Sequence, residues 1–125
     1  MSDLMRWLLH GSLTPAAGEA LRRHGHHAQT PADIGIQSEA LPEEIFAAAR
    51  KGQLDIFTSD PFLAAAPYEQ HLSFPRTVVL LLTPGGDVEQ DDAVDRLFTR
   101  YKRLSPGRLY TITPNRVKVR QLPQT

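Results

Sequence analysis

The sequence predicts an α/β domain, a three-layer α/β/α sandwich built on a mostly parallel sheet. Short apolar runs alternate along the chain with stretches whose apolar residues recur every three or four positions, the pattern of alternating strands and helices. The run "TVVLLL" at residues 77–82 is uninterrupted by charged residues and apolar after its first residue, which is typical of a strand buried on both faces of a parallel sheet. The 125 residues are enough for one core, so we expect a single domain over residues 1–125.

The first strand is expected at residues 4–9, where an apolar run stops at His10. Thr14 is a good N-cap, and Pro15 suits the first position of a helix because its missing N–H group would be unbonded there in any case. The apolar spacing that follows predicts a helix, and Gly25 is well placed to end it.

The middle of the chain continues the alternation, and proline, glycine or other turn residues separate its elements. In chain order we expect a strand at 27–30, a helix at 42–52, a strand at 55–58, a short helix at 61–66 and the strand at 77–82. The segment "TPADIGI" between the first two of these is expected to be a turn or loop.

The last third of the chain is expected to form one helix and a β-hairpin. After the loop "TPGGD", Asp91 or Asp92 is a candidate cap for a helix with an apolar stripe. The segment "LYTITPNRVKVR" is typical of two strands around a tight turn, and its second strand alternates valine with basic residues. Because right-handed crossovers favour an internal first strand, we expect the sheet order 2-1-3-4 with this hairpin at an edge.

Candidate functional residues gather where the first and third strands end. In open α/β sheets, ligands bind beyond the carboxyl ends of the strands where the strand order reverses, so we expect His10 and Asp60 to be neighbours there. Glu43 and Glu44 open the next helix and could join Asp60 in holding Mg²⁺ or Mn²⁺. Each residue also has a structural interpretation: Asp60 as a helix cap, the glutamates as partners of the helix dipole, and His10 as a hydrogen-bonded polar residue.

The net charge is zero, but the charges are unevenly distributed. Residues 96–125 contain eight Lys and Arg and no Asp or Glu. Such a split either marks a polyanion-binding face or is neutralised by the acidic first part of the chain in the fold. For the first interpretation, the candidate RNA-binding residues are Arg100, Arg103, Arg116, Lys118 and Arg120.

Composition excludes several classes of protein. The chain has no cysteine, which excludes disulfides, thiol catalysis and Cys-based zinc sites. No apolar run approaches the roughly 20 residues of a membrane span, and the first residues do not resemble a secretory signal. We therefore expect a cytoplasmic protein without membrane contact.

Five segments together resemble the PIN-like domains, in particular the compact bacterial branch related to VapC toxins: "LLHGSLTPAAGEALRRHGH", "ADIGI", "PEEIFAAARKGQLDIFTSDPF", "TVVLLL" and "LYTITPNRVKVR". The resemblance implies a ribonuclease whose clustered carboxylates hold Mg²⁺ or Mn²⁺, together with an antitoxin-like protein partner and a homodimer. Of the family's acids, the one ending the first strand falls on His10 and the one opening the second helix falls on Pro42, beside Glu43 and Glu44. Asp60 matches the first of two aspartates after the third strand, and the second aspartate is missing.

The missing carboxylates predict a PIN-like protein with a depleted metal site, a module that binds RNA or a protein partner and has weak or no nuclease activity. The alternative hypothesis is an active Mg/Mn-dependent endoribonuclease of toxin type. In it, Asp60, Glu44 and His10 would be catalytic, and Asp60, Glu43 and Glu44 would hold the metal. A receiver-type signalling domain is a third hypothesis, but it requires an acidic pair where His10 and Gly11 stand.

Overall fold

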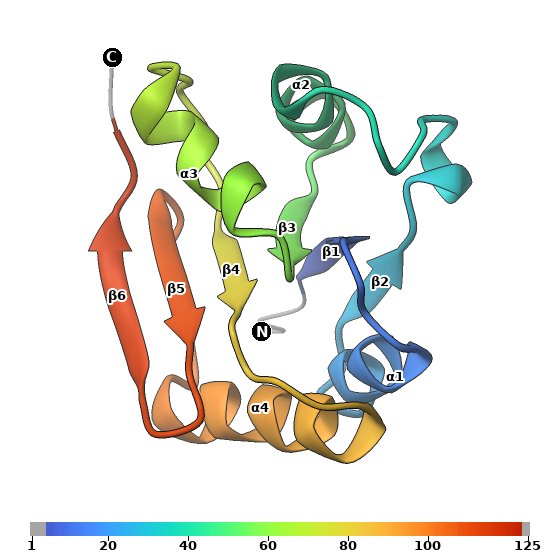
Figure 1. Ribbon diagram of the computed structural model, residues 1–125, viewed down its shortest axis with the longest axis vertical. Helices are drawn as coiled ribbons and strands as arrows, with labels where there is room; N and C mark the ends of the chain where they lie inside the picture. Colours follow the sequence, from blue (N-terminus) through green and yellow to red (C-terminus); the bar gives the residue numbers. More distant parts are fainter. Residues whose placement is uncertain (1–4, 124–125) are drawn as a thin grey trace.

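A computed structural model describes residues 5–123 as one six-stranded sheet covered by helices (Figure 1). The elements are β1 (Arg6–His10), α1 (Pro15–Arg23), β2 (His27–Gln29), a 3₁₀ turn η1 (Ala32–Ile34), α2 (Pro42–Gly52), β3 (Asp55–Thr58), α3 (Pro61–Glu69), β4 (Val78–Leu81), α4 (Asp87–Arg100), β5 (Arg108–Ile112) and β6 (Val117–Gln121). The strand order is β2-β1-β3-β4-β5-β6, and β6 alone pairs antiparallel in this sheet.

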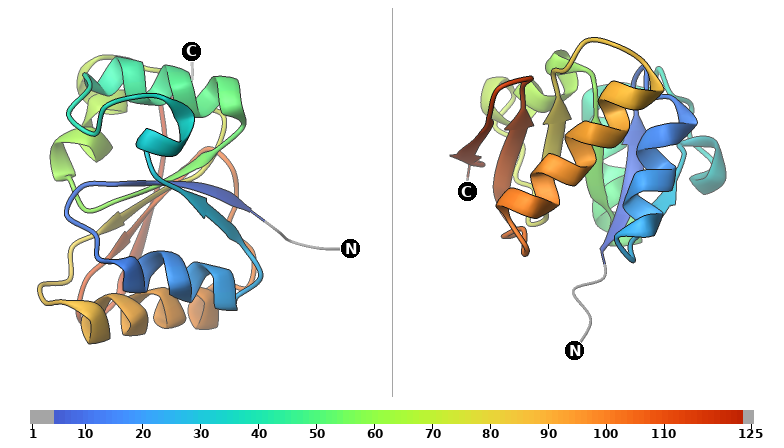
Figure 2. Two further views of the ribbon diagram at one scale, coloured as in Figure 1. Left: turned by 90° about the vertical axis from the view of Figure 1, so that its right-hand side faces the viewer. Right: turned by 90° about the horizontal axis from the view of Figure 1, so that it is seen from below.

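The predicted fold class, strand order and edge hairpin are confirmed. Helices α1 and α4 cover one face of the sheet, and α2 and α3 cover the other, so the domain has three layers (Figure 2). Residues 1–4, which include the first residue of the predicted first strand, lie outside the described part of the chain, as do residues 124–125.

Two helices differ from the prediction at one end. Helix α4 begins at Asp87 rather than at Asp91 or Asp92, because Gly86 is its N-cap and Glu89 folds back to accept a 2.8 Å hydrogen bond from the Gly86 N–H. Helix α3 continues to Glu69 and contains Pro67, whereas the prediction ended it at residue 66. A proline in the last turn of a short helix costs only one backbone hydrogen bond, so Pro67 does not end the helix at residue 66.

Side chains of the central strands alternate between two cores. Trp7 and Phe57 point toward α1 and α4, with their rings edge-to-face at 5.9 Å, while Leu8 and Ile56 point toward α2 and α3. Strands β3 and β4 are buried along their whole length. The uninterrupted apolar run in β4 is therefore explained by helices on both faces, as the sequence predicted.

The crossover through α4 has the opposite hand to the other three crossovers. The connections through α2, α3 and α4 all step across the sheet in the same direction, yet α2 and α3 pack on one face and α4 packs beside α1 on the other. Because about 98% of such connections are right-handed, the general rule would place α4 on the same face as α2 and α3. No local sequence pattern indicates this placement on the opposite face. Its consequence is that α4 lies against the β5–β6 hairpin on the α1 side of the sheet (Figure 2).

Asp55 is a buried carboxylate at the amino end of β3, 2% exposed. Its Oδ1 accepts a 2.9 Å hydrogen bond from the Thr77 N–H, and its Oδ2 lies 3.4 Å from the Arg76 guanidinium. Burial raises the pKa of Asp55, and this effect outweighs the opposing effects of Thr77 and Arg76. The native state therefore holds a proton on Asp55 more tightly than the unfolded chain does.

This raised pKa predicts that Asp55 makes the protein less stable as pH rises. The contribution of Asp55 to the free energy of unfolding is greatest in acid. It is lost as pH rises from about 4, the ordinary carboxyl pKa, through the higher pKa of the folded state, because the unfolded chain releases the proton first. Asp55→Asn keeps an oxygen for the Thr77 N–H but carries no charge, so it is expected to flatten this decline. The measurement is the free energy of unfolding in urea between about pH 4 and pH 7.

Asp33 is a control of opposite sign. Asp33 is exposed, and hydrogen bonds from Thr30 lower its pKa. Its contribution to stability is therefore present above the ordinary carboxyl pKa and is lost as pH falls through the lowered pKa of the folded state. Asp33→Asn should leave the decline above pH 4 unchanged. A decline that persists in Asp55→Asn contradicts the assignment to Asp55.

Candidate functional site

The carboxyl ends of β1 and β3 lie side by side, as predicted. The register places His10 opposite Thr58, and the two segments that leave the strands remain bonded to each other. Ser59 N–H donates to the His10 carbonyl at 3.2 Å, and Ser12 N–H donates to Ser59 Oγ at 2.7 Å. Gly11 turns the chain between these contacts with φ of +90°.

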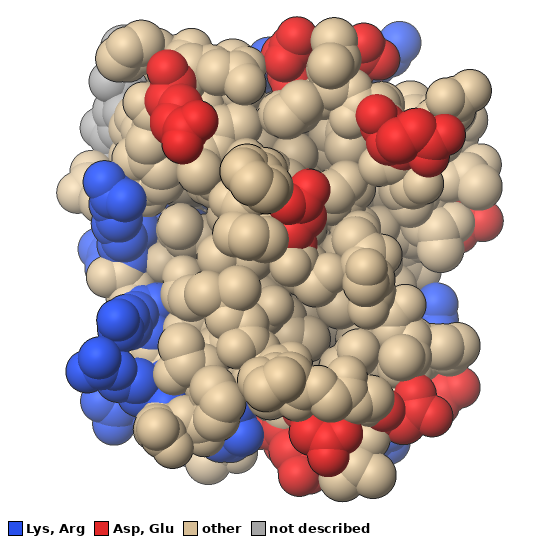
Figure 3. Space-filling model, in the orientation of Figure 1, with Lys and Arg blue, Asp and Glu red and all other residues tan. Residues whose placement is uncertain are grey.

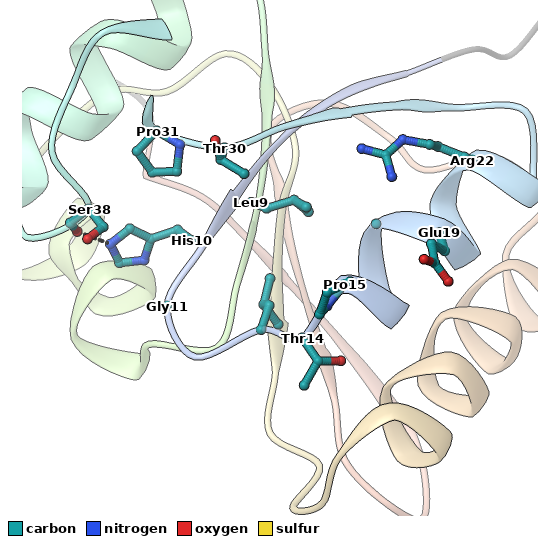
Figure 4. Close-up of a pocket in the computed structure, with 12 residues that line it drawn as sticks. Leu9, His10, Gly11, Thr14, Pro15, Glu19, Arg22, Thr30, Pro31 and Ser38 are labelled. Atoms are coloured by element: carbon teal, nitrogen blue, oxygen red, sulfur yellow. Dashed lines mark hydrogen bonds between the residues drawn. The ribbon is translucent and has the colours of Figure 1, made fainter. Parts of the chain in front are cut away.

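The His10 imidazole is held inside this junction, 8% exposed. Its Nε2 lies 3.1 Å from the Ser38 carbonyl oxygen, and its Nδ1 lies 2.9 Å from Thr58 Oγ1. A carbonyl oxygen only accepts hydrogen bonds, so Nε2 carries the proton, and in the neutral ring Nδ1 then accepts from the Thr58 hydroxyl. Figure 4 shows the ring pointing toward Ser38. Both nitrogens are therefore used within the protein, and a metal ion could bind His10 only by replacing one of these bonds.

Asp60 caps α3. Its Oδ1 accepts a 2.9 Å hydrogen bond from the Phe62 N–H, and its own N–H donates to Thr58 Oγ1 at 2.9 Å. The Thr58 hydroxyl thus accepts from Asp60 and donates to His10, so it joins the two predicted site residues. The imidazole and the carboxylate do not bond to each other. Each has the contacts of a structural residue: His10 is a hydrogen-bonded polar residue, and Asp60 is a helix cap.

The glutamates do not complete a metal site in the described chain. Glu43 and Glu44 are exposed in the first turn of α2. Within residues 5–123, neither glutamate forms a hydrogen bond or an ion pair with His10 or Asp60. No three His, Asp or Glu side chains in that range lie close enough together to hold a metal ion. The metal-binding and catalytic roles of Asp60, Glu43, Glu44 and His10 stay predictions.

A pocket of about 340 Å³ opens beside the end of β1 (Figure 4). Leu13, Pro15 and Pro31 give it an apolar lining, and Glu19 and Arg22 of α1 supply its charges. The guanidinium of Arg22 also donates to the Ala28 carbonyl at 3.1 Å. Sequence reasoning did not single out Glu19 or Arg22. Their spacing on α1 indicates only that they share a helix face, which is too common a pattern to mark a site.

The predicted RNA-binding residues gather far from this pocket, along the edge of the sheet formed by β6 and beside the end of α4. Figure 3 shows Lys and Arg along the left side of the molecule, over the β5–β6 hairpin. Lys118 and Arg120 are exposed, and the Arg120 guanidinium lies 3.8 Å from the centre of the Tyr68 ring on α3. Val117 and Val119 lie opposite Ile112 and Tyr110, whose side chains face α4, so the basic and apolar faces of the last strand are separate, as predicted.

No helix among residues 5–123 combines the length and the apolar composition needed to cross a membrane. No protein-family model, curated protein or solved structure matches this chain. Any assignment of function to it therefore depends on its own architecture and on the positions of its side chains.

Proposed function

We propose that this chain is a PIN-like module that binds single-stranded RNA, with weak or no nuclease activity. The observation that carries the proposal is the basic edge, which we define as Arg100, Arg103, Arg116, Lys118 and Arg120. All five are exposed, and the last thirty residues of the sequence contain no Asp or Glu. Binding to a phosphate backbone depends on such cations, whatever the base sequence.

The geometry of β6 suits an extended polyanion. It is an edge strand, and it presents Lys118 and Arg120 on one face at every second residue, about 7 Å apart. Stacking on Tyr68 holds the Arg120 guanidinium in place, so less side-chain entropy is lost when it meets a phosphate. An RNA strand lying along this edge would meet at least one cation, Arg120, that is already held in place.

The junction of β1 and β3 supports weak or absent catalysis. A hard divalent ion requires several oxygen ligands, and Asp60 already accepts a backbone hydrogen bond as a helix cap. His10 has both nitrogens bonded, and no three His, Asp or Glu side chains within residues 5–123 lie close enough together to hold a metal ion. An antitoxin-like protein partner, implied by the sequence resemblance, would be expected to cover the same cations and so compete with RNA.

RNA affinity is expected to fall steeply with salt. For a single strand, the logarithm of the binding constant falls by about 0.7 for each phosphate neutralised per tenfold rise in salt, so three or four contacts give a slope near −2 to −3. The double variant Lys118→Ala/Arg120→Ala should weaken binding and reduce the slope by about 1 to 1.5. Fluorescence anisotropy with a labelled twelve-nucleotide RNA at several salt concentrations measures both quantities.

Lys51→Ala is the matched control, because Lys51 is an exposed cation on α2, away from the basic edge. Equal losses in Lys51→Ala and the double variant, or an affinity that does not change with salt, would refute the proposal.

The same RNA tests the alternative hypothesis of a metal-dependent endoribonuclease. We expect it to remain intact with Mg²⁺ or Mn²⁺. Cleavage that requires Mn²⁺, stops in EDTA and is lost in Asp60→Asn would establish the ribonuclease instead. Asparagine caps helices nearly as well as aspartate, so this variant should remain folded.

A further inference from the structure

A cleft of about 930 Å³ separates the last turns of α4 from the β5–β6 turn. Three arginines line it: Arg96 and Arg100 from α4, and Arg116 from the turn. Figure 1 shows the β5–β6 turn beside the C-terminal half of α4. The cleft is therefore built by two segments that the unusual hand of the α4 crossover brings together.

Arg96 fixes one wall of the cleft. Its Nη2 donates to the Thr113 carbonyl at 2.8 Å, and the Arg116 backbone N–H donates to Thr113 Oγ1 at 3.2 Å, so both arginines are anchored to the same residue. Only one of the five N–H donors of Arg96 is bonded within residues 5–123, and its Nε is buried without a partner there. Arg100 follows Arg96 by one helical turn, about 6 Å along the axis.

Two acids also line the cleft. Asp92 lies one helical turn before Arg96, about 6 Å along the axis, and two turns before Arg100, about 12 Å. Asp95 lies 2.8 Å from the Nε2 of His24, which occupies one of its oxygens. The neutral donors of Asn115 and Thr99 complete the lining around the arginines. One end of the cleft is thus rich in hydrogen-bond donors, and the other end carries the carboxylate of Asp92.

We infer that this cleft binds a terminal phosphomonoester of RNA. A monoester carries close to two negative charges at neutral pH, against one for an internal phosphodiester, and has three acceptor oxygens. Planar guanidinium groups bind such oxygens in pairs, and a concave site with several of them suits the end of a strand better than a passing backbone. This inference rests on the proposed RNA binding and adds a preference for phosphorylated ends.

The test compares one short RNA with and without a 5′-phosphate, and the same RNA with a 3′-phosphate, by fluorescence anisotropy at fixed salt. We expect one phosphorylated end to bind about tenfold more tightly than the unphosphorylated RNA, the gain typical of one or two charge-assisted hydrogen bonds. Arg100→Gln and Arg116→Gln should remove this ratio. Asp92→Asn should increase it, because the variant removes a negative charge from the cleft.

Lys118→Gln is the matched control. It lies on the face of β6 turned away from α4 and should weaken all three RNAs equally. Inorganic phosphate and a nucleoside monophosphate serve as competitors. If millimolar nucleoside monophosphate abolishes the preference for phosphorylated over unphosphorylated RNA, the result supports a site for the phosphate ester itself. Stronger competition by inorganic phosphate would assign the cleft to free phosphate and overturn the inference. Equal affinity for all three RNAs also overturns it, while the proposed RNA binding survives if the salt dependence remains.

Discussion

Replacing His10 with alanine is expected to lower the free energy of unfolding by about 3 kcal/mol. The ring is almost fully buried and bonds to Thr58 Oγ1 and to the Ser38 carbonyl, so the variant leaves a cavity and removes the hydrogen-bond partner that His10 gives to each of these groups. These bonds join the end of β1 to the end of β3 and to the loop before α2. Urea unfolding followed by far-ultraviolet circular dichroism measures the loss.

The same variant separates a structural His10 from a metal ligand. Because both ring nitrogens are bonded within the protein, we expect Mn²⁺ to change the thermal unfolding temperature of the wild type and of His10→Ala by the same amount, even if that amount is zero. A Mn²⁺-dependent stabilisation of the wild type that disappears in His10→Ala would show instead that the ring leaves Thr58 or Ser38 to bind the ion.

Sequence patterning was sufficient for the sheet, because most of its strands are short apolar or alternating runs bounded by turn residues. It also placed His10 beside Asp60, since parallel strands end at one edge of a sheet and the strand order could be inferred. The pattern could not reveal how those side chains bond. The partners of His10, Thr58 and Ser38, are 48 and 28 residues away in the chain and contribute a hydroxyl and a backbone carbonyl, neither of which leaves a motif.

The basic edge illustrates the same limit. An absence of acids after residue 96 indicates where positive charge accumulates, and alternation along β6 indicates which of its side chains share a face. Neither shows that Arg96 and Arg100 lie opposite Arg116, because that contact depends on α4 packing beside α1 rather than beside α2. The cleft lined by three arginines thus arises from the one crossover whose hand departs from the general rule.

Gly11→Ala is expected to destabilise the protein by about 3 kcal/mol, and Gly25→Ala by only about 1 kcal/mol. Both glycines have nearly equal positive φ, +90° and +87°, so we expect a similar backbone cost of a side chain at the two positions. A Cβ on Gly11 would lie 2.4 Å from Ser59 Oγ and 3.2 Å from the Ser59 backbone nitrogen, whereas a Cβ on Gly25 meets nothing within 4 Å. Ser59 must move, and its bond from the Ser12 N–H breaks.

The difference in stability between the two glycine variants therefore measures how tightly the ends of β1 and β3 are joined, because the cost of a side chain at positive φ largely cancels in the comparison. Both free energies of unfolding come from urea titrations under the same conditions. Equal losses would mean that Ser59 shifts at little cost and that the junction is loose. A loose junction could open to expose His10 and Asp60 to a metal ion, so this comparison also tests whether hydrogen bonds between the ends of β1 and β3 close the metal site that we hypothesise there.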